Sequence, residues 1–210
     1  MKYNALIFDF DGTIADTLSE AAEVYNILAL QYGYKTVSSE EIPAMRHYNT
    51  KKLIKELGVS KLRLPFLLAK GRRLFKSRID NLTPVDGMIE SLHELRKEAT
   101  TFGILTSNST ENVELFLNAY NIRDLFTFIS STTKLSGKSK HLTSISRTFS
   151  IPTSDMLYIG DEIRDVKASQ KAGIDIAAVT WGFNSKESLE IERPTYLFDT
   201  AEALTTTLLK

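Results

Sequence analysis

The chain has 210 residues, 42% of them hydrophobic, and its 26 basic residues balance its 26 acidic ones. This composition suffices for a sizeable core in one or two domains, and the lack of net charge excludes a global field that would draw the protein to nucleic acid or to an anionic membrane surface. The absence of cysteine excludes disulfides and a thiolate nucleophile. Because no leader pattern and no membrane-length apolar run is present, we expect a cytoplasmic protein that binds neither nucleic acid nor membrane.

The first predicted element is a strand of four apolar residues, 5–8, and two aspartates follow it. Such an uninterrupted run is typical of a strand buried on both faces of a parallel sheet. Asp9 and Asp11 lie at its carboxyl end, where open α/β sheets bind ligands, and residues two apart in an extended segment point to one side. Paired carboxylates repel unless a cation such as Mg²⁺ compensates them. Asp and Gly are also common in turns, so this stretch alone is equally compatible with a plain loop.

Residues from about 16 to about 83 show helical patterns and no convincing strand. Apolar residues recur at spacings of three and four between Leu18 and Ala29, and further helical patterns follow around Leu53 and after Pro65. This insert is large enough to form a small domain. We therefore predict a helical cap over residues 16–83 and a core formed by residues 1–15 and 84–210.

Strands and helices alternate in the remainder of the chain. Apolar segments at 102–105, 126–129, 156–159, 176–179 and 196–198 predict strands, and amphipathic segments between them predict helices. This alternation predicts an α/β fold, with a Rossmann-like parallel sheet that is covered by helices on both faces.

Three of the predicted strands end in polar residues, and parallel strands would bring these ends to one edge of the sheet. The residues are Asp9 and Asp11; Thr106, Ser107 and Asn108; and Asp161 with Asp165. Two lysines, Lys138 and Lys140, lie at the start of another predicted helix. Carboxylates, hydroxyls and an ammonium group would thus converge, although Ser107 and Asn108 are also common helix caps.

In this ordered set the chain resembles the haloacid dehalogenase superfamily, specifically its Mg²⁺-dependent phosphatases with a helical cap after the first strand, such as phosphoglycolate phosphatase-like enzymes. The resemblance covers essentially the whole core. The four motifs are matched by Asp9-Phe10-Asp11-Gly12-Thr13, Thr106, a lysine near 138, and Gly160-Asp161 with Asp165.

The resemblance implies a role for each matched residue. Asp9 would attack phosphorus and form an aspartyl-phosphate, and Asp11 would act as the general acid and base. Thr106, Ser107 and the lysine would bind the phosphate. Asp9, the main-chain carbonyl of Asp11, and Asp161 would hold Mg²⁺, and Asp165 would orient these ligands.

Two details depart from the family pattern. The third motif in many relatives is Lys-Pro, whereas residues 137–140 here offer two lysines. We expect Lys138, which directly follows a glycine at the helix start, to contact the phosphate, with Lys140 as the alternative. Glu162 and Arg164, between the aspartates of the fourth motif, are compatible with a solvated helix start that carries an ion pair.

The sequence thus predicts a phosphatase that acts on a small phosphorylated metabolite, but it does not identify that metabolite. A phosphomutase of the same fold would also use a phosphorylated Asp9, and a non-catalytic regulator would only bind the phosphorylated ligand. A dehalogenase is disfavoured, because a halide leaving group needs no proton from Asp11. The charged residues of the insert are typical of solvated helix faces, and the oligomeric state is not indicated.

Overall fold

The computed structural model describes residues 1–132 and 137–210 and contains a six-stranded, fully parallel sheet. The strand order is β5-β4-β1-β6-β7-β8, so that β1 lies at the centre. The strands are β1 (Ala5–Phe8), β4 (Thr101–Thr106), β5 (Phe128–Ser131), β6 (Met156–Gly160), β7 (Asp175–Val179) and β8 (Tyr196–Phe198). The predicted α/β fold is confirmed.

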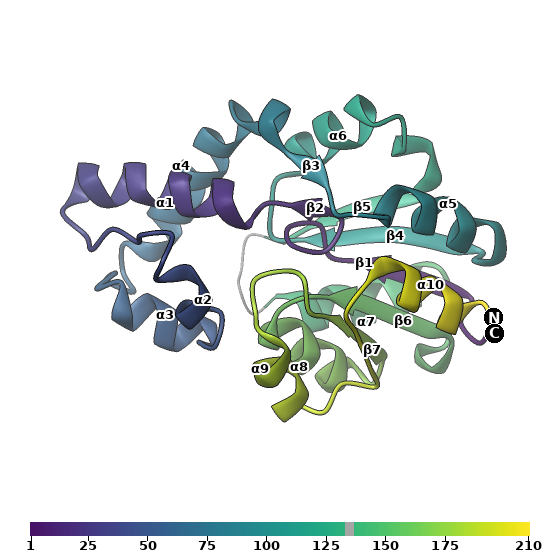
Figure 1. The fold of residues 1–210 in the computed structure, drawn as a ribbon. Coiled ribbons are helices and arrows are strands. Elements are labelled where there is room, and N and C mark those ends of the chain that lie inside the picture. The colour runs from purple at the N-terminus through teal and green to yellow at the C-terminus, as the bar shows by residue number, and fades with distance from the viewer. Residues whose placement is uncertain (133–136) are drawn as a thin grey trace.

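Helices cover both faces of this sheet, and two hydrophobic cores result (Figure 1). Leu6 and Phe8 of β1 point into one core, whereas Ala5 and Ile7 point into the other, as expected for alternating side chains in a strand. The first core is closed by α5 (Met88–Glu98), α6 (Thr110–Ala119) and α10 (Ala201–Leu208). The second is closed by α7 (Lys138–Thr148), α8 (Ile163–Ala172) and α9 (Lys186–Ile191). Burial on both faces explains why β1 reads as an uninterrupted apolar run.

Residues 16–83, called the helical segment below, project beyond the sheet at the end opposite to the two chain termini (Figure 1). They contain α1 (Leu18–Tyr32), α2 (Ile42–Met45), α3 (Thr50–Glu56), α4 (Leu64–Lys76) and the 3-10 turn η1 (Ile79–Asn81). Two other 3-10 turns, η2 (Arg123–Leu125) and η3 (Thr153–Asp155), lie outside this segment. The helical segment joins the rest of the chain through an antiparallel ribbon of β2 (Ala15–Asp16) and β3 (Thr83–Pro84). These two-residue strands were not predicted, because two residues carry no periodicity. The division into two domains stays a prediction.

Side chains also connect the helical segment to the core away from the ribbon. Arg46 donates from Nη2 to the Thr180 carbonyl at 2.6 Å. Asn184 donates from Nδ2 to the carbonyls of Arg46 and Tyr48, at 2.9 and 3.0 Å. We call this set, Arg46 and Tyr48 against Thr180 and Asn184, the loop latch. Within the described ranges, no helix has the length and apolar character to cross a membrane.

Candidate active site

The loop after β1 turns back on itself and brings Asp9 and Asp11 to the carboxyl edge of the sheet. The Asp9 amide continues the pairing with β6 by donating to the Ile159 carbonyl at 2.7 Å. The Phe10 carbonyl then accepts from three successive amides, those of residues 13–15, and closes the turn. Gly12 has a φ of +74°, and a Cβ there would lie 2.4 Å from Asp161 Oδ2, so that only glycine fits between the two loops.

Asp9 and Asp165 are joined by the ammonium group of Lys138. Lys138 Nζ lies 2.5 Å from Asp9 Oδ2 and 2.6 Å from Asp165 Oδ1, and all three side chains are buried. Burial raises the pKa of Asp9 to about 7 against the opposing attraction of Lys138. Burial would lower the pKa of Lys138, but Asp165 and Asp9 outweigh it and raise that pKa. Lys140, the alternative lysine, is exposed, so the structure places Lys138 beside the aspartates.

Asp161 has a different environment, because neutral groups hold its buried carboxylate. Thr13 Oγ1 donates to Oδ1 at 2.9 Å, and the Phe183 amide donates to Oδ2 at 2.7 Å. In residues 1–132 and 137–210 no cationic side chain forms an ion pair with Asp161. Burial, followed by repulsion from Glu162, Asp9 and Asp165, raises the pKa of Asp161 well above its usual value.

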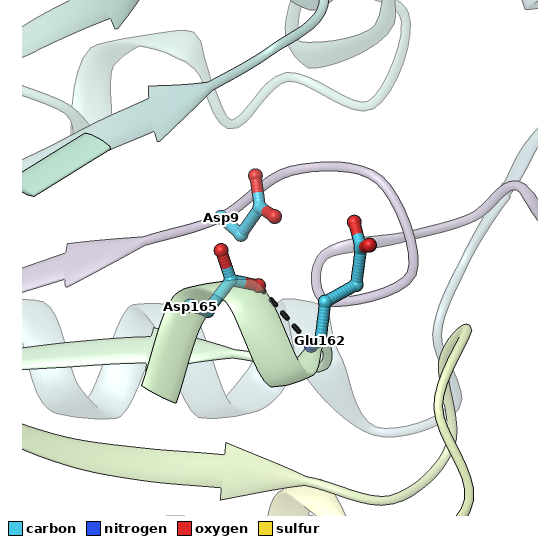
Figure 2. A group of neighbouring side chains, drawn as sticks. All are labelled: Asp9, Glu162 and Asp165. Atoms are coloured by element: carbon cyan, nitrogen blue, oxygen red, sulfur yellow. Dashed lines mark hydrogen bonds between the residues drawn. The ribbon is translucent and has the colours of Figure 1, made fainter. Parts of the chain in front are cut away.

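A group of three acidic side chains, Asp9, Glu162 and Asp165, gathers where β1 and α8 meet (Figure 2). Their carboxylate oxygens lie within 4.8 Å of one another. Asp165 Oδ2 also accepts from the Glu162 amide at 3.1 Å, which fixes the first turn of α8. With Asp11 and Asp161, five acidic groups face two cationic ones, Lys138 and Arg164. This excess of acidic over cationic side chains provides carboxylate oxygens that fit a hard divalent cation such as Mg²⁺.

The Asp11 side chain is held in place by a hydrogen bond from the side-chain amide of Asn108. Asn108 Nδ2 donates to Asp11 Oδ1 at 3.1 Å, and the Asn108 Oδ1 accepts from the Asn112 side chain at 2.9 Å. Asn112 Nδ2 lies 3.1 Å from the carbonyl of Arg72 in α4. Burial raises the pKa of Asp11 to about 6, although the bond from Asn108 opposes the rise. A hydrogen-bonded chain therefore leads from Asp11 to the helical segment.

The remaining predicted phosphate-binding residues follow β4. Thr106 Oγ1 is buried and accepts from the Asn108 amide at 2.9 Å. Ser107 Oγ accepts from Arg164 Nη2 at 3.2 Å. Thr106 and Ser107 thus lie at the same sheet edge as Asp9 and Asp11, as the parallel strands require.

The site includes three residues to which the sequence analysis gave no catalytic role: Asn108, Glu162 and Arg164. Glu162 and Arg164 do form the ion pair considered for them, with Arg164 Nε 2.8 Å from Glu162 Oε1, but the pair is largely buried. Asn108 is the third residue after the predicted strand 102–105, and its place in the polar segment at that strand end was a signal for a site position. Its hydrogen bond to Asp11 joins two residues that are 97 positions apart in the sequence, so the local pattern could not predict it.

Comparison with known proteins identifies relatives of most or all of the chain. The family model described as haloacid dehalogenase-like hydrolase matches residues 6–179. A phosphoglycolate phosphatase from Synechococcus elongatus is 32% identical over 200 residues, covering 95% of this chain and 94% of that protein. The pyrophosphatase PpaX from Bacillus thuringiensis is 24% identical, with 95% and 93% covered. A solved structure of a predicted phosphatase from Clostridium acetobutylicum has a TM-score of 0.86 at 20% identity and covers 100% of this chain and 99% of that one. The resemblance is confirmed, and the chain belongs to the haloacid dehalogenase-like hydrolases.

Proposed function

We propose that the protein is a Mg²⁺-dependent phosphatase that hydrolyses a small phosphomonoester through an aspartyl-phosphate on Asp9. The observation that carries this proposal is the placement of Asp9. Its Oδ1 accepts from the Phe10 amide at 2.8 Å and its Oδ2 accepts from Lys138 at 2.5 Å, while Asp11 follows two residues later at the same edge. A fixed nucleophile beside a proton donor is the arrangement that covalent phosphoryl transfer needs.

In the first half of the reaction an Asp9 carboxylate oxygen bonds to phosphorus, and the bond from phosphorus to the ester oxygen breaks. Asp11 gives its proton to the departing alkoxide, and its pKa of about 6 leaves a usable protonated fraction near neutral pH. In the second half Asp11 takes a proton from water, which attacks phosphorus and releases Asp9 and inorganic phosphate. Asn108 keeps Asp11 oriented in both halves.

Positive charge at the phosphoryl oxygens would come from Lys138 and from Mg²⁺, with Thr106 and Ser107 as hydrogen-bond partners. Asp9, the Asp11 carbonyl and Asp161 would hold the metal, and Asp165 would orient Asp9 through Lys138. When bound, Mg²⁺ supplies charge that offsets the repulsion between an anionic nucleophile and an anionic phosphate. The lack of a cationic partner for Asp161 in the described ranges supports this ligand set.

The test is phosphate release from a panel of phosphomonoesters, with Mg²⁺ and with a chelator, by the wild type and by Asp9→Asn. An amide is nearly isosteric with the carboxylate but is a poor nucleophile, so we expect kcat to fall by at least roughly 10³-fold. Asp124→Asn, which changes an exposed aspartate, is the matched control. Substantial hydrolysis by a folded Asp9→Asn protein would rule out the covalent role.

The same panel separates the alternatives. A phosphomutase would return an isomeric phosphate ester instead of inorganic phosphate, and a regulator would bind without turnover. Unchanged activity in the chelator would overturn the metal requirement. We further propose that residues 16–83 act as a cap on a core of residues 1–15 and 84–210, and that the enzyme works on a cytoplasmic metabolite.

A further inference from the structure

A cavity of about 340 Å³ opens on the candidate active site and extends into the helical segment. Its volume is in the range of pockets that hold small organic ligands. Its core end is lined by polar or charged residues: Asp11, Ser107, Asn108, Glu162 and Arg164. Its other end is lined mainly by apolar side chains of α1, α3 and α4, among them Val24, Leu28, Leu53, Leu57, Leu67 and Phe75.

The apolar end is not packed like the interior of a helical bundle. Leu53, Ile54 and Leu68 line the cavity and remain partly exposed. Protein interiors are normally close-packed, so a void of this size between apolar side chains leaves dispersion contacts unmade. Gly71 in the middle of α4 also lines the cavity, although an interior glycine costs a helix about 1 kcal/mol relative to alanine. A ligand in the cavity would make the missing contacts, and the absence of a side chain at Gly71 leaves room for it.

Among the described residues four charged groups line the cavity, and Arg72 of α4 is the one that belongs to the helical segment. They are two acids, Asp11 and Glu162, and two arginines, Arg72 and Arg164, so their charges balance. Glu162 already binds Arg164 at its Nε, with an N–O distance of 2.8 Å. Arg164 Nη1 is buried and has no partner in the described ranges, and a phosphoryl oxygen at the core end would accept from it.

We propose that the substrate is an amphipathic phosphomonoester, whose leaving group is an alkyl or aryl alcohol that lies in this cavity. The inference rests on the proposed function and names its substrate class. Phosphorus is attacked at Asp9, the bond to the ester oxygen breaks, and the apolar alcohol leaves with the proton of Asp11. Water then restores Asp9 and yields inorganic phosphate, so that no further reactant is needed.

The first experiment compares kcat/KM with Mg²⁺ for ethyl, butyl, hexyl and octyl phosphate, with 2-phosphoglycolate and pyrophosphate as anionic probes. Burial of each added methylene should raise kcat/KM about threefold to fourfold until the cavity is full. We expect hexyl phosphate to exceed both anionic probes. A flat series, or a preference for 2-phosphoglycolate over hexyl phosphate, would overturn the proposal.

A binding measurement keeps the inference separate from the proposed function. Calorimetry with hexylphosphonate and methylphosphonate, which are not hydrolysed, should give a tighter dissociation constant for the hexyl compound and a more negative heat-capacity change. If acetyl phosphate and every ester resist hydrolysis, the proposed function fails. The affinities of the two phosphonates still test whether the cavity binds an apolar group. Equal affinity of the two phosphonates would reject the apolar subsite even in an active phosphatase.

The cavity can also be filled from Gly71. A Cβ there would meet Leu28 Cδ1 at 3.8 Å and Val24 Cγ1 at 3.9 Å, which are ordinary contacts, so Gly71→Ala should fold. Gly71→Leu reaches further into the cavity, and its thermal unfolding is compared with that of the wild type before its kinetics are interpreted. We expect Gly71→Leu to lower the ratio of kcat/KM for hexyl to ethyl phosphate at least tenfold, with Gly71→Ala in between. Ala69→Leu adds similar bulk on the exposed face of α4 and should keep the wild-type ratio. An unchanged ratio in Gly71→Leu would contradict the proposed position of the leaving group.

Discussion

Asp161 is fully buried, yet a hydroxyl and a peptide amide hold its carboxylate where a cation would be expected. An ionised carboxylate in such surroundings is costly unless positive charge compensates it. Asp9 and Asp165 differ in this respect, because both contact Lys138. At the scale of single residues, Asp11 and Asp161 are the two acidic side chains of the described site without an ion pair, and of these two Asp161 is the fully buried one.

Replacing Asp161 should for this reason weaken metal binding more than folding. We expect Asp161→Ala to raise the Mg²⁺ concentration for half-maximal activity about tenfold or more. Mg²⁺ should raise the thermal unfolding temperature of the wild type by binding the folded state, and this increase should shrink in the variant. Asp124→Ala serves as the exposed control. A Mg²⁺ titration that matches the wild type would remove Asp161 from the metal site.

At the scale of elements, α6 connects Asp11, the proposed proton donor, to the helical segment. The helix begins after Ser109, whose side chain accepts from the Asn112 amide at 3.2 Å. This cap fixes the first turn, and Asn112 then binds both Asn108 and the Arg72 carbonyl. The orientation of Asp11 is thus tied to the position of α4.

Asn112 should act as a positioning residue. In Asn112→Ala the Asn108 side chain keeps the bond from the Ser109 amide but loses the one from Asn112. We therefore expect kcat to fall about tenfold while KM changes little, together with a stability loss of about 1–3 kcal/mol for the unpaired buried groups. Asn118→Ala, on the exposed face of α6, is the control. In a double-mutant cycle the kcat effects of Asn108→Ala and Asn112→Ala should be non-additive. Additive effects would show that the two amides act independently.

At the scale of the whole molecule, the contacts between the helical segment and the core include the β2–β3 ribbon, the loop latch, the Asn112 contact and the packing of Phe75 and Ile79 in the first hydrophobic core. The ribbon has only two residues per strand, so few hydrogen bonds resist a change in its angle. Asn184 of the loop latch also accepts from the Ile163 amide at 2.9 Å, next to the carboxylates of α8. Asn184 therefore contacts both the helical segment and the start of α8, beside the candidate site.

Removing the Arg46 side chain from the loop latch should loosen the helical segment and leave the sheet intact. We expect Arg46→Ala to increase hydrogen exchange in residues 16–83 by at least severalfold, with no change in β1, β4 and β6, since local opening needs only the contacts of that region. Hexylphosphonate should reduce the difference if it holds the segment closed. Arg73→Ala removes an exposed arginine of α4 and should exchange like the wild type. Equal protection of the helical segment in Arg46→Ala would show that the bond from the Arg46 side chain to Thr180 does not hold it.

Much of the fold followed from local patterns. The apolar run before Asp9 predicted a central strand, because a strand buried on both faces must be apolar at every position. The later strands were predicted to within one or two residues, with β5 the least accurate, since it begins at Phe128 rather than Phe126. The ends of parallel strands share one edge, which is why residues as distant as Asp11 and Thr106 could be assigned to one site.

The sheet, the helical character of residues 16–83 and the four aspartates of the site could thus be predicted from the sequence, because these depend on residue type and spacing along the chain. The tertiary structure was needed to add Glu162 to the acidic group and to show that Lys138 rather than Lys140 is buried between Asp9 and Asp165. It also decided that Asn108 binds Asp11, and that a cavity joins the site to the helical segment. These features depend on contacts between residues far apart in the chain, and local periodicity carries no information about such contacts.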